Sequence, residues 1–173
     1  EYLIDSSEAS EAFLVAENCG LVADCTNEGA VKTVSGISNF TESKSIGALV
    51  SVNKGRVEGC VNNGKVAIYN KAFWKCPMWV GGVVGKTCPE TPGTSVSGCS
   101  NSGYVVLHAL RAKSPLFVGG VVGGSAATLQ TSEYKCDALA DYGQILNCSN
   151  SGRVRIENED IASENANNIN NHN

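Results

Sequence analysis

The sequence has little of what enzymes use for acid–base chemistry and little of what fills a large core. Among its 173 residues there are two histidines, His108 and His172, and aromatic residues make up only 6%. His172 lies in a polar tail and His108 follows a Val-rich run, so we expect neither to act as a general base. Few aromatic rings, with abundant Val, Gly, Ser and Asn, are typical of a narrow interior filled by small side chains.

Further absences argue against several other functions. The formal net charge is −4 and the Lys and Arg residues are scattered, which gives a nucleic-acid role no electrostatic support. No apolar run approaches the length of a transmembrane helix. Cys-x-x-Cys does not occur, which argues against zinc-ribbon and thioredoxin-like sites. Acidic residues do not recur at equivalent positions, with Asp24 and Glu58 coming nearest, so we expect no enzyme, no cofactor and no bound metal.

What the chain does contain is a fourfold internal repeat. The pattern Cys-x-Asn-x-Gly-x-Val occurs at 25–31, 60–66, 99–105 and 148–154. Upstream of it, residues 14–25 align without gaps on residues 49–60, and the third and fourth copies begin with Val-Gly-Gly-Val-Val-Gly. Self-similarity at a period of roughly 35 to 50 residues indicates a solenoid or another repeat array.

The apolar runs within each repeat predict strands, because they are short, Val-rich and bounded by Asn and Gly. We predict an all-β fold, a parallel β-helix (β-solenoid) of about four coils, with three short strands per coil and loop insertions at 86–94 and 124–143. Residues 13–157 form this repeat domain, residues 1–12 a cap or linker, and residues 158–173 a polar, Asn-rich tail. The strands are expected near 13–16, 47–52, 80–85 and 117–122; near 21–26, 56–61, 95–100 and 144–149; and near 30–34, 65–70, 104–109 and 153–157.

The repeated residues suit a stack of coils whose strands lie about 4.8 Å apart. Four asparagines would form one column in which the amides hydrogen-bond to each other: Asn27, Asn62, Asn101 and Asn150. Four glycines are expected to have positive φ, where a Cβ is penalised: Gly29, Gly64, Gly103 and Gly152. Four valines would point into the core: Val31, Val66, Val105 and Val154.

Eight cysteines divide into two groups. Four lie in the repeat column: Cys25, Cys60, Cys99 and Cys148. Neighbours in this column are close enough for a disulfide, yet Cys is also a good small buried residue, so paired rungs and a reduced stack both remain open. Of the other four, Cys88 and Cys136 lie in equivalent insertions and are predicted to pair, which leaves Cys19 and Cys76 as the second pair.

Two features favour an oxidising compartment. One is the set of disulfide-capable cysteines. The other is the sequon Asn39-Phe40-Thr41, which lies in a loop between the first two repeats and makes Asn39 a candidate glycosylation site. We therefore expect an extracellular or cell-surface protein.

Candidate ligand contacts lie where the repeat is interrupted. The segment 71–79 contains both tryptophans, Trp74 and Trp79, which would stack on a sugar or contact a protein partner if exposed, and close a coil corner if buried. Tyr134 and Tyr142 in the last insertion form a second candidate patch.

The combination Gly-Gly-Val-Val-Gly followed by Gly-x-Val-x-x-Cys-x-Asn-x-Gly-x-Val resembles the GLUG-motif repeats of microbial surface proteins. Those repeats carry a Gly-Gly-Leu-Val-Gly core and a downstream Asn-Cys-x-Asn-x-Gly-x-Val, and the resemblance covers about residues 13–157. It implies a cell-surface, adhesin-like or secreted protein. The long insertions and the extra cysteines depart from the family pattern.

These observations favour a non-enzymatic extracellular module for surface display, adhesion or scaffolding, with a protein or a carbohydrate on a cell surface as its partner. One alternative is a self-assembling subunit of a filament or stalk, in which copies of the chain pair through the open strand edges at the coil ends. Another is a carbohydrate-active β-helix enzyme, which would need clustered acids on one face.

Overall fold

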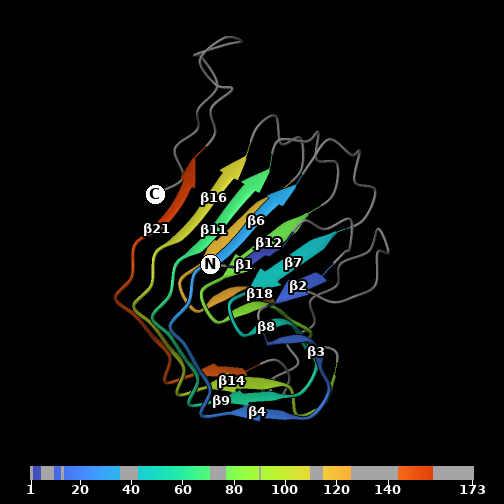
Figure 1. Cartoon of the computed structure of the whole chain (residues 1–173). Helices are drawn as coiled ribbons and strands as arrows, with labels where there is room; N and C mark the ends of the chain where they lie inside the picture. Colours follow the sequence, from blue (N-terminus) through green and yellow to red (C-terminus); the bar gives the residue numbers. More distant parts are fainter. Residues whose placement is uncertain are drawn as a thin grey trace, which may run out of the picture.

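The chain winds into successive coils whose strands stack in parallel, each coil beside the previous one (Figure 1). The computed structural model describes residues 2–4, 10–12, 14–35, 43–70, 77–89, 91–109, 115–125 and 144–157. Within these residues every regular element is a strand, and the strands of neighbouring coils pair in register. The predicted parallel β-helix of about four coils is therefore confirmed.

Five sheets run through the stack. The five-stranded sheet contains β1 (Tyr2–Ile4), β6 (Val31–Ser35), β11 (Val66–Asn70), β16 (Val105–Ala109) and β21 (Val154–Glu157). The next contains β2 (Ser10–Ala12), β7 (Lys44–Gly47), β12 (Met78–Gly81) and β17 (Leu116–Gly119). The third contains β3 (Val15–Asn18), β8 (Val50–Asn53), β13 (Val84–Thr87) and β18 (Val122–Ser125). The fourth contains β4 (Leu21–Ala23), β9 (Arg56–Glu58), β14 (Ser95–Ser97) and β19 (Gln144–Leu146). The fifth contains β5 (Thr26–Asn27), β10 (Val61–Asn62), β15 (Ser100–Asn101) and β20 (Ser149–Asn150).

A complete coil therefore has five strands where the sequence predicts three, because corners divide the first two predicted segments. The second segment breaks immediately before the column cysteine, where four residues adopt left-handed conformations: Asp24 (φ 51°), Gly59 (φ 58°), Gly98 (φ 61°) and Asn147 (φ 53°). Gly, Asn and Asp are the residues that tolerate this conformation best. The first segment breaks after Gly47, Gly81 and Gly119, where the chain turns too tightly for a side chain.

The ends of the predicted segments also differ in detail. The two insertions begin later than expected, because Lys86 and Thr87 continue β13 and Gly124 and Ser125 continue β18 in register with the neighbouring coils. In the predicted N-terminal cap, β1 pairs with β6 and β2 pairs with β7, so both extend the sheets. The predicted tail, residues 158–173, lies outside the described residues.

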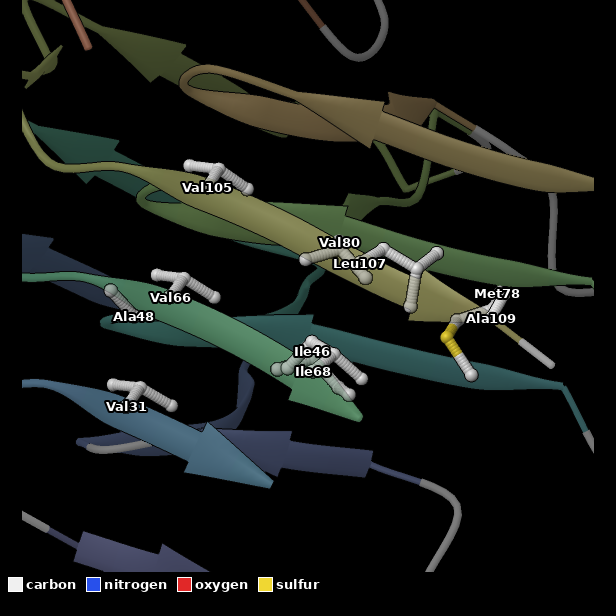
Figure 2. Packing of buried hydrophobic residues seen from close by; sticks show 10 residues of the cluster. All are labelled: Val31, Ile46, Ala48, Val66, Ile68, Met78, Val80, Val105, Leu107 and Ala109. Carbon is white, nitrogen blue, oxygen red and sulfur yellow. The ribbon is translucent and has the colours of Figure 1, made fainter. Parts of the chain in front are cut away.

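Two apolar clusters fill the interior. The first lies between the five-stranded sheet and the β2-β7-β12-β17 sheet, where Val31, Val66 and Val105 lie one above another on successive coils (Figure 2). The second lies where the third and fourth sheets meet, and it includes Cys60 and Cys99. Burying one such Val side chain contributes about 1.5–3 kcal/mol. The predicted inward valines are confirmed for these three, whereas Val154 in the last coil is exposed.

The prediction of positive φ at the repeat glycines is wrong. Among the described glycines, positive φ occurs at Gly59, Gly93 and Gly98. The repeat glycine is needed for a different reason: a Cβ on Gly64 would lie 1.9 Å from the carbonyl oxygen of Gly29, and one on Gly103 would lie 1.9 Å from that of Gly64. The missing side chain therefore lets adjacent coils approach each other closely.

This explanation predicts that Gly64→Ala and Gly29→Ala differ. The Cβ of Gly64→Ala would push two coils apart and lower the free energy of unfolding by about 3 kcal/mol. Gly29 belongs to the first coil, and its Cβ would meet only its own Asn27 Oδ1, at 3.7 Å. Gly29→Ala should therefore change stability by less than about 0.5 kcal/mol. Urea unfolding followed by circular dichroism measures the free energy of unfolding of both variants. Equal losses of stability would contradict the explanation and indicate a backbone requirement that the two positions share.

Candidate functional site

The asparagine column predicted from the repeat is present and forms a continuous hydrogen-bonded ladder. The Nδ2 of Asn27 donates to Asn62 Oδ1 at 2.7 Å, Asn62 donates to Asn101 at 2.7 Å, and Asn101 donates to Asn150 at 2.8 Å. Each Nδ2 also donates to the carbonyl two residues later, as Asn62 does to Gly64 at 2.9 Å. Asn62 is fully buried; its Nδ2 donates two hydrogen bonds and its Oδ1 accepts two.

A second ladder, not predicted from the sequence, runs along the end of the third sheet. Asn18 Nδ2 donates to Asn53 Oδ1 at 2.9 Å, and Asn53 Nδ2 contacts Thr87 Oγ1 at 3.5 Å. The same two amides donate to the carbonyls of Arg56 and Ser95 in the following coil, at 3.0 and 3.1 Å. The gapless alignment of residues 14–25 on 49–60 places Asn18 opposite Asn53, and this was the signal for the second ladder. The asparagine does not recur in the third coil, where Thr87 occupies the equivalent position.

The first ladder and the sheets end at the first and last coils that the structure describes. At the last coil, Asn150 Nδ2 donates to the Gly152 carbonyl at 2.8 Å, and its second hydrogen has no partner in the described residues. At the first coil, Asn27 is buried, and its Oδ1 accepts from Gly29 but, unlike Asn62 Oδ1, from no asparagine of the described residues. Large apolar side chains are exposed at these ends: Leu14 and Leu21 in the first coil, and Ile145, Leu146, Val154 and Ile156 in the last.

The four column cysteines stack as free thiols beside the second apolar cluster. Each Sγ contacts the carbonyl two residues earlier, at 3.2 Å for Cys25 and 3.4 Å for Cys60, Cys99 and Cys148. A hydrogen bond with Cys60 and burial together raise the pKa of the Cys99 thiol, and burial raises that of Cys25. Of the two outcomes left open by the sequence, the structure has the reduced stack.

The predicted disulfides Cys88–Cys136 and Cys19–Cys76 stay predictions, since Cys136 and Cys76 lie outside the described residues. Cys88 is buried and Cys19 is exposed. No disulfide joins two of the described cysteines. Trp74, Tyr134, Tyr142 and the candidate glycosylation site Asn39 also lie in segments that the structure does not describe.

Trp79, the one candidate ligand contact in the described residues, is packed into the fold. Its side chain is 9% exposed and stacks on Phe117 of the next coil, with ring centroids 5.8 Å apart and planes 9° apart. The Lys86 ammonium lies 5.1 Å from its ring. Trp79 thus offers no open face for a sugar. Phe117, 43% exposed, is the accessible ring of this pair, and the sequence reading missed it.

A second group of interacting side chains lies on the five-stranded sheet. The rings of Tyr69 and His108 stack with centroids 4.5 Å apart, and His108 Nδ1 lies 2.7 Å from Glu157 Oε2. Glu157 also accepts from Arg155 at 3.0 Å. The three stacked residues occupy one register position on β11, β16 and β21. His108 is therefore held between neighbouring coils.

The described residues were also searched for groups that could hold a metal ion and for helices that could cross a membrane. No group of three or more His, Cys, Asp or Glu side chains in the described part of the chain is placed to hold one metal ion. Asp24 and Glu58 are adjacent in register, and Glu58 is paired with Arg56. Over the same ranges, none of the elements is a helix long and apolar enough to cross a bilayer.

The ladder predicts unequal costs for removing an inner and an outer asparagine. Asn62→Ala removes the buried hydrogen bonds that the Asn62 amide makes with Asn27, Asn101 and Gly64, so it should lower the free energy of unfolding by about 3 kcal/mol or more. Asn150→Ala, at the exposed end, should cost about 1 kcal/mol, because water replaces the lost bonds. Denaturant unfolding of both variants checks this; an Asn150 variant as damaged as the Asn62 variant would contradict the ladder's dependence on coil position.

A scan against protein-family models, a search of curated proteins and a search of solved structures found no match to this chain. The resemblance to GLUG-motif repeats thus rests on the residues quoted for it, and the family of the chain is a proposal.

Proposed function

We propose that this chain is a non-enzymatic extracellular module that serves surface display, adhesion or scaffolding. The observation that carries the proposal is that the repeated residues make contacts with neighbouring coils or with the core. Asn62 hydrogen-bonds to the asparagines above and below it, and Val66 packs in the core. The carbonyl oxygen of Gly29 occupies the space that a side chain on Gly64 would need. The repeat thus builds a support, and sequence variation is left to its corners and insertions, where solenoid proteins carry their binding residues.

The resemblance to GLUG-motif repeats and the sequon at Asn39 support the extracellular placement. The reduced cysteine column is compatible with it, because Cys60 and Cys99 are fully buried and so protected from soluble oxidants. A protein or carbohydrate on a cell surface is the proposed partner, and the interrupted segments, not the regular faces, are the proposed contact sites.

Antibodies against the folded domain provide the test. They should label intact cells of the organism that encodes the chain, with no further gain after the cells are permeabilised. An antibody against a cytosolic protein of the same cells is the matched control, since it should label only permeabilised cells. Labelling by the domain antibody that appears only after permeabilisation would contradict the proposal.

A second function, self-assembly into a filament or stalk, is favoured by the coil ends. The last coil presents exposed Ile145, Leu146 and Ile156 together with the second Nδ2 hydrogen of Asn150, and the first coil presents exposed Leu14 and Leu21. Open strand edges of this type pair with other chains unless they are covered.

Self-assembly predicts that the sedimentation coefficient rises with protein concentration. The variant Ile145→Lys/Ile156→Lys places charge on the last coil and should restore a monomer across the series, because burying unpaired charge at an interface is unfavourable. Lys65→Glu changes charge at an exposed position of the second coil and serves as the control that should still assemble. A wild-type chain that remains monomeric at the highest concentration would exclude this function.

A further inference from the structure

Cations that are scattered in the sequence gather on one face of the solenoid. This is the outer face of the five-stranded sheet, which forms one side of the stack (Figure 1). Val66, Val105 and the other inward residues of the sheet point into the core, so the residues that alternate with them point outward. Four of the eight Lys and Arg residues in the described ranges lie here and define the basic face: Lys32, Lys65, Arg153 and Arg155.

The other four cations of the described ranges are paired or buried on other sheets. Lys54 and Arg56 each form an ion pair with a glutamate. Lys44 and Lys86 are buried. On the basic face, by contrast, three of the four cations are exposed and Lys32 is half-buried. The exposed cations without an acid each are therefore concentrated on this face.

One acid of the described residues, Glu157, lies on the basic face. It contacts both Arg155 and His108, at 3.0 and 2.7 Å. Glu28, in the turn before the sheet, accepts a hydrogen bond from Asn63 at 2.8 Å. With His108 neutral, four cations and one carboxylate leave three unbalanced positive charges on this face, although the formal net charge of the chain is −4. The face is therefore complementary to a negatively charged ligand.

The cations follow the axis along which the coils stack. Lys32 and Arg155 occupy the same register position in the first and last coils. Three strand spacings separate them, which is about 14 Å. Lys65 of the second coil and Arg153 of the last coil lie on either side of Tyr104, each directly before the inward valine of its own coil. Such a row can contact a polymer that lies along the stack at several points, whereas a small anion would meet one or two cations.

Aromatic rings hold two of these cations. The Lys65 ammonium lies 5.5 Å from the Tyr104 ring centroid, and that of Lys32 lies 5.7 Å from the Tyr69 centroid. Such contacts restrict the lysine side chains before a ligand arrives, which lowers the entropy cost of binding. The rings themselves are occupied, since Tyr69 also stacks on His108. They therefore offer no free platform on which nucleic-acid bases could stack.

We propose that the basic face binds a linear acidic polysaccharide, whose carboxylate groups contact the cations of successive coils. A lipid surface fits less well, because the apolar residues of this face, Ala67 and Val106, are buried and cannot insert into a bilayer. A DNA duplex fits less well, because its dense charge would extend beyond the face over the acids of a chain that is negative overall. This site goes beyond the function proposed above, whose contact sites are the interrupted segments.

The test is calorimetric titration of the full chain with polygalacturonate, a linear carboxylated polysaccharide, at low and at high salt. The wild-type chain should bind polygalacturonate but not neutral dextran, and binding should weaken as salt screens the exposed charges. Lys65→Gln/Arg153→Gln should weaken binding about tenfold or more, because each cation near a polyanionic surface contributes separately. Lys54→Gln/Arg56→Gln removes the same charge from other sheets and should stay within about twofold of the wild type.

Equal losses in the two double variants would show that net charge alone matters and would overturn the proposal. Binding of double-stranded DNA as tight as that of polygalacturonate at the same salt would also overturn it, as would a wild-type chain that does not bind polygalacturonate at low salt. Circular dichroism establishes that each variant is folded. If the Lys65 substitution disturbs the fold, Arg153→Gln alone should still weaken binding about threefold, and unchanged binding would again contradict the proposal.

Discussion

A buried side-chain amide has two hydrogens and an oxygen that must find partners away from water, and this requirement governs the whole molecule. In each inner coil the partner of an asparagine is the same asparagine one coil away. Asn62 is satisfied only if Asn27 and Asn101 lie directly below and above it. That condition fixes the register of the coils, and a one-residue slip would break every rung at once and turn the valines away from the core.

The close packing of the coils follows from the same register. The carbonyl of Gly29 lies where a side chain on Gly64 would otherwise be, and the contact recurs between Gly64 and Gly103. The cysteines keep one conformation because their backbones superimpose from coil to coil. The asparagine ladder, the glycine contacts and the column of thiols thus all result from one periodic backbone. A change in the spacing between coils would disrupt all three.

Much of this architecture could be predicted from the sequence, because a repeat reveals which residues share a position. The Asn27 column and the inward valines followed directly. The reason for the glycines did not, since recurrence shows that a side chain is excluded without showing whether φ or a neighbouring coil excludes it. The second ladder was missed because Thr87 replaces its third asparagine. Burial of Trp79 depends on Phe117, which is 38 positions away in sequence, and a contact at that distance is visible only once the coils are stacked.

The asparagine ladder also has a direction. The amides of Asn27, Asn62 and Asn101 each donate toward the later coil, and those of Asn62, Asn101 and Asn150 each accept from the earlier one. The amide dipoles therefore align and add along the stack, as peptide dipoles do along an α-helix. Reversing a coil would place donor against donor. The ladder consequently has two chemically distinct ends, an amide oxygen of the buried Asn27 in the first coil and an amide donor of Asn150 in the last.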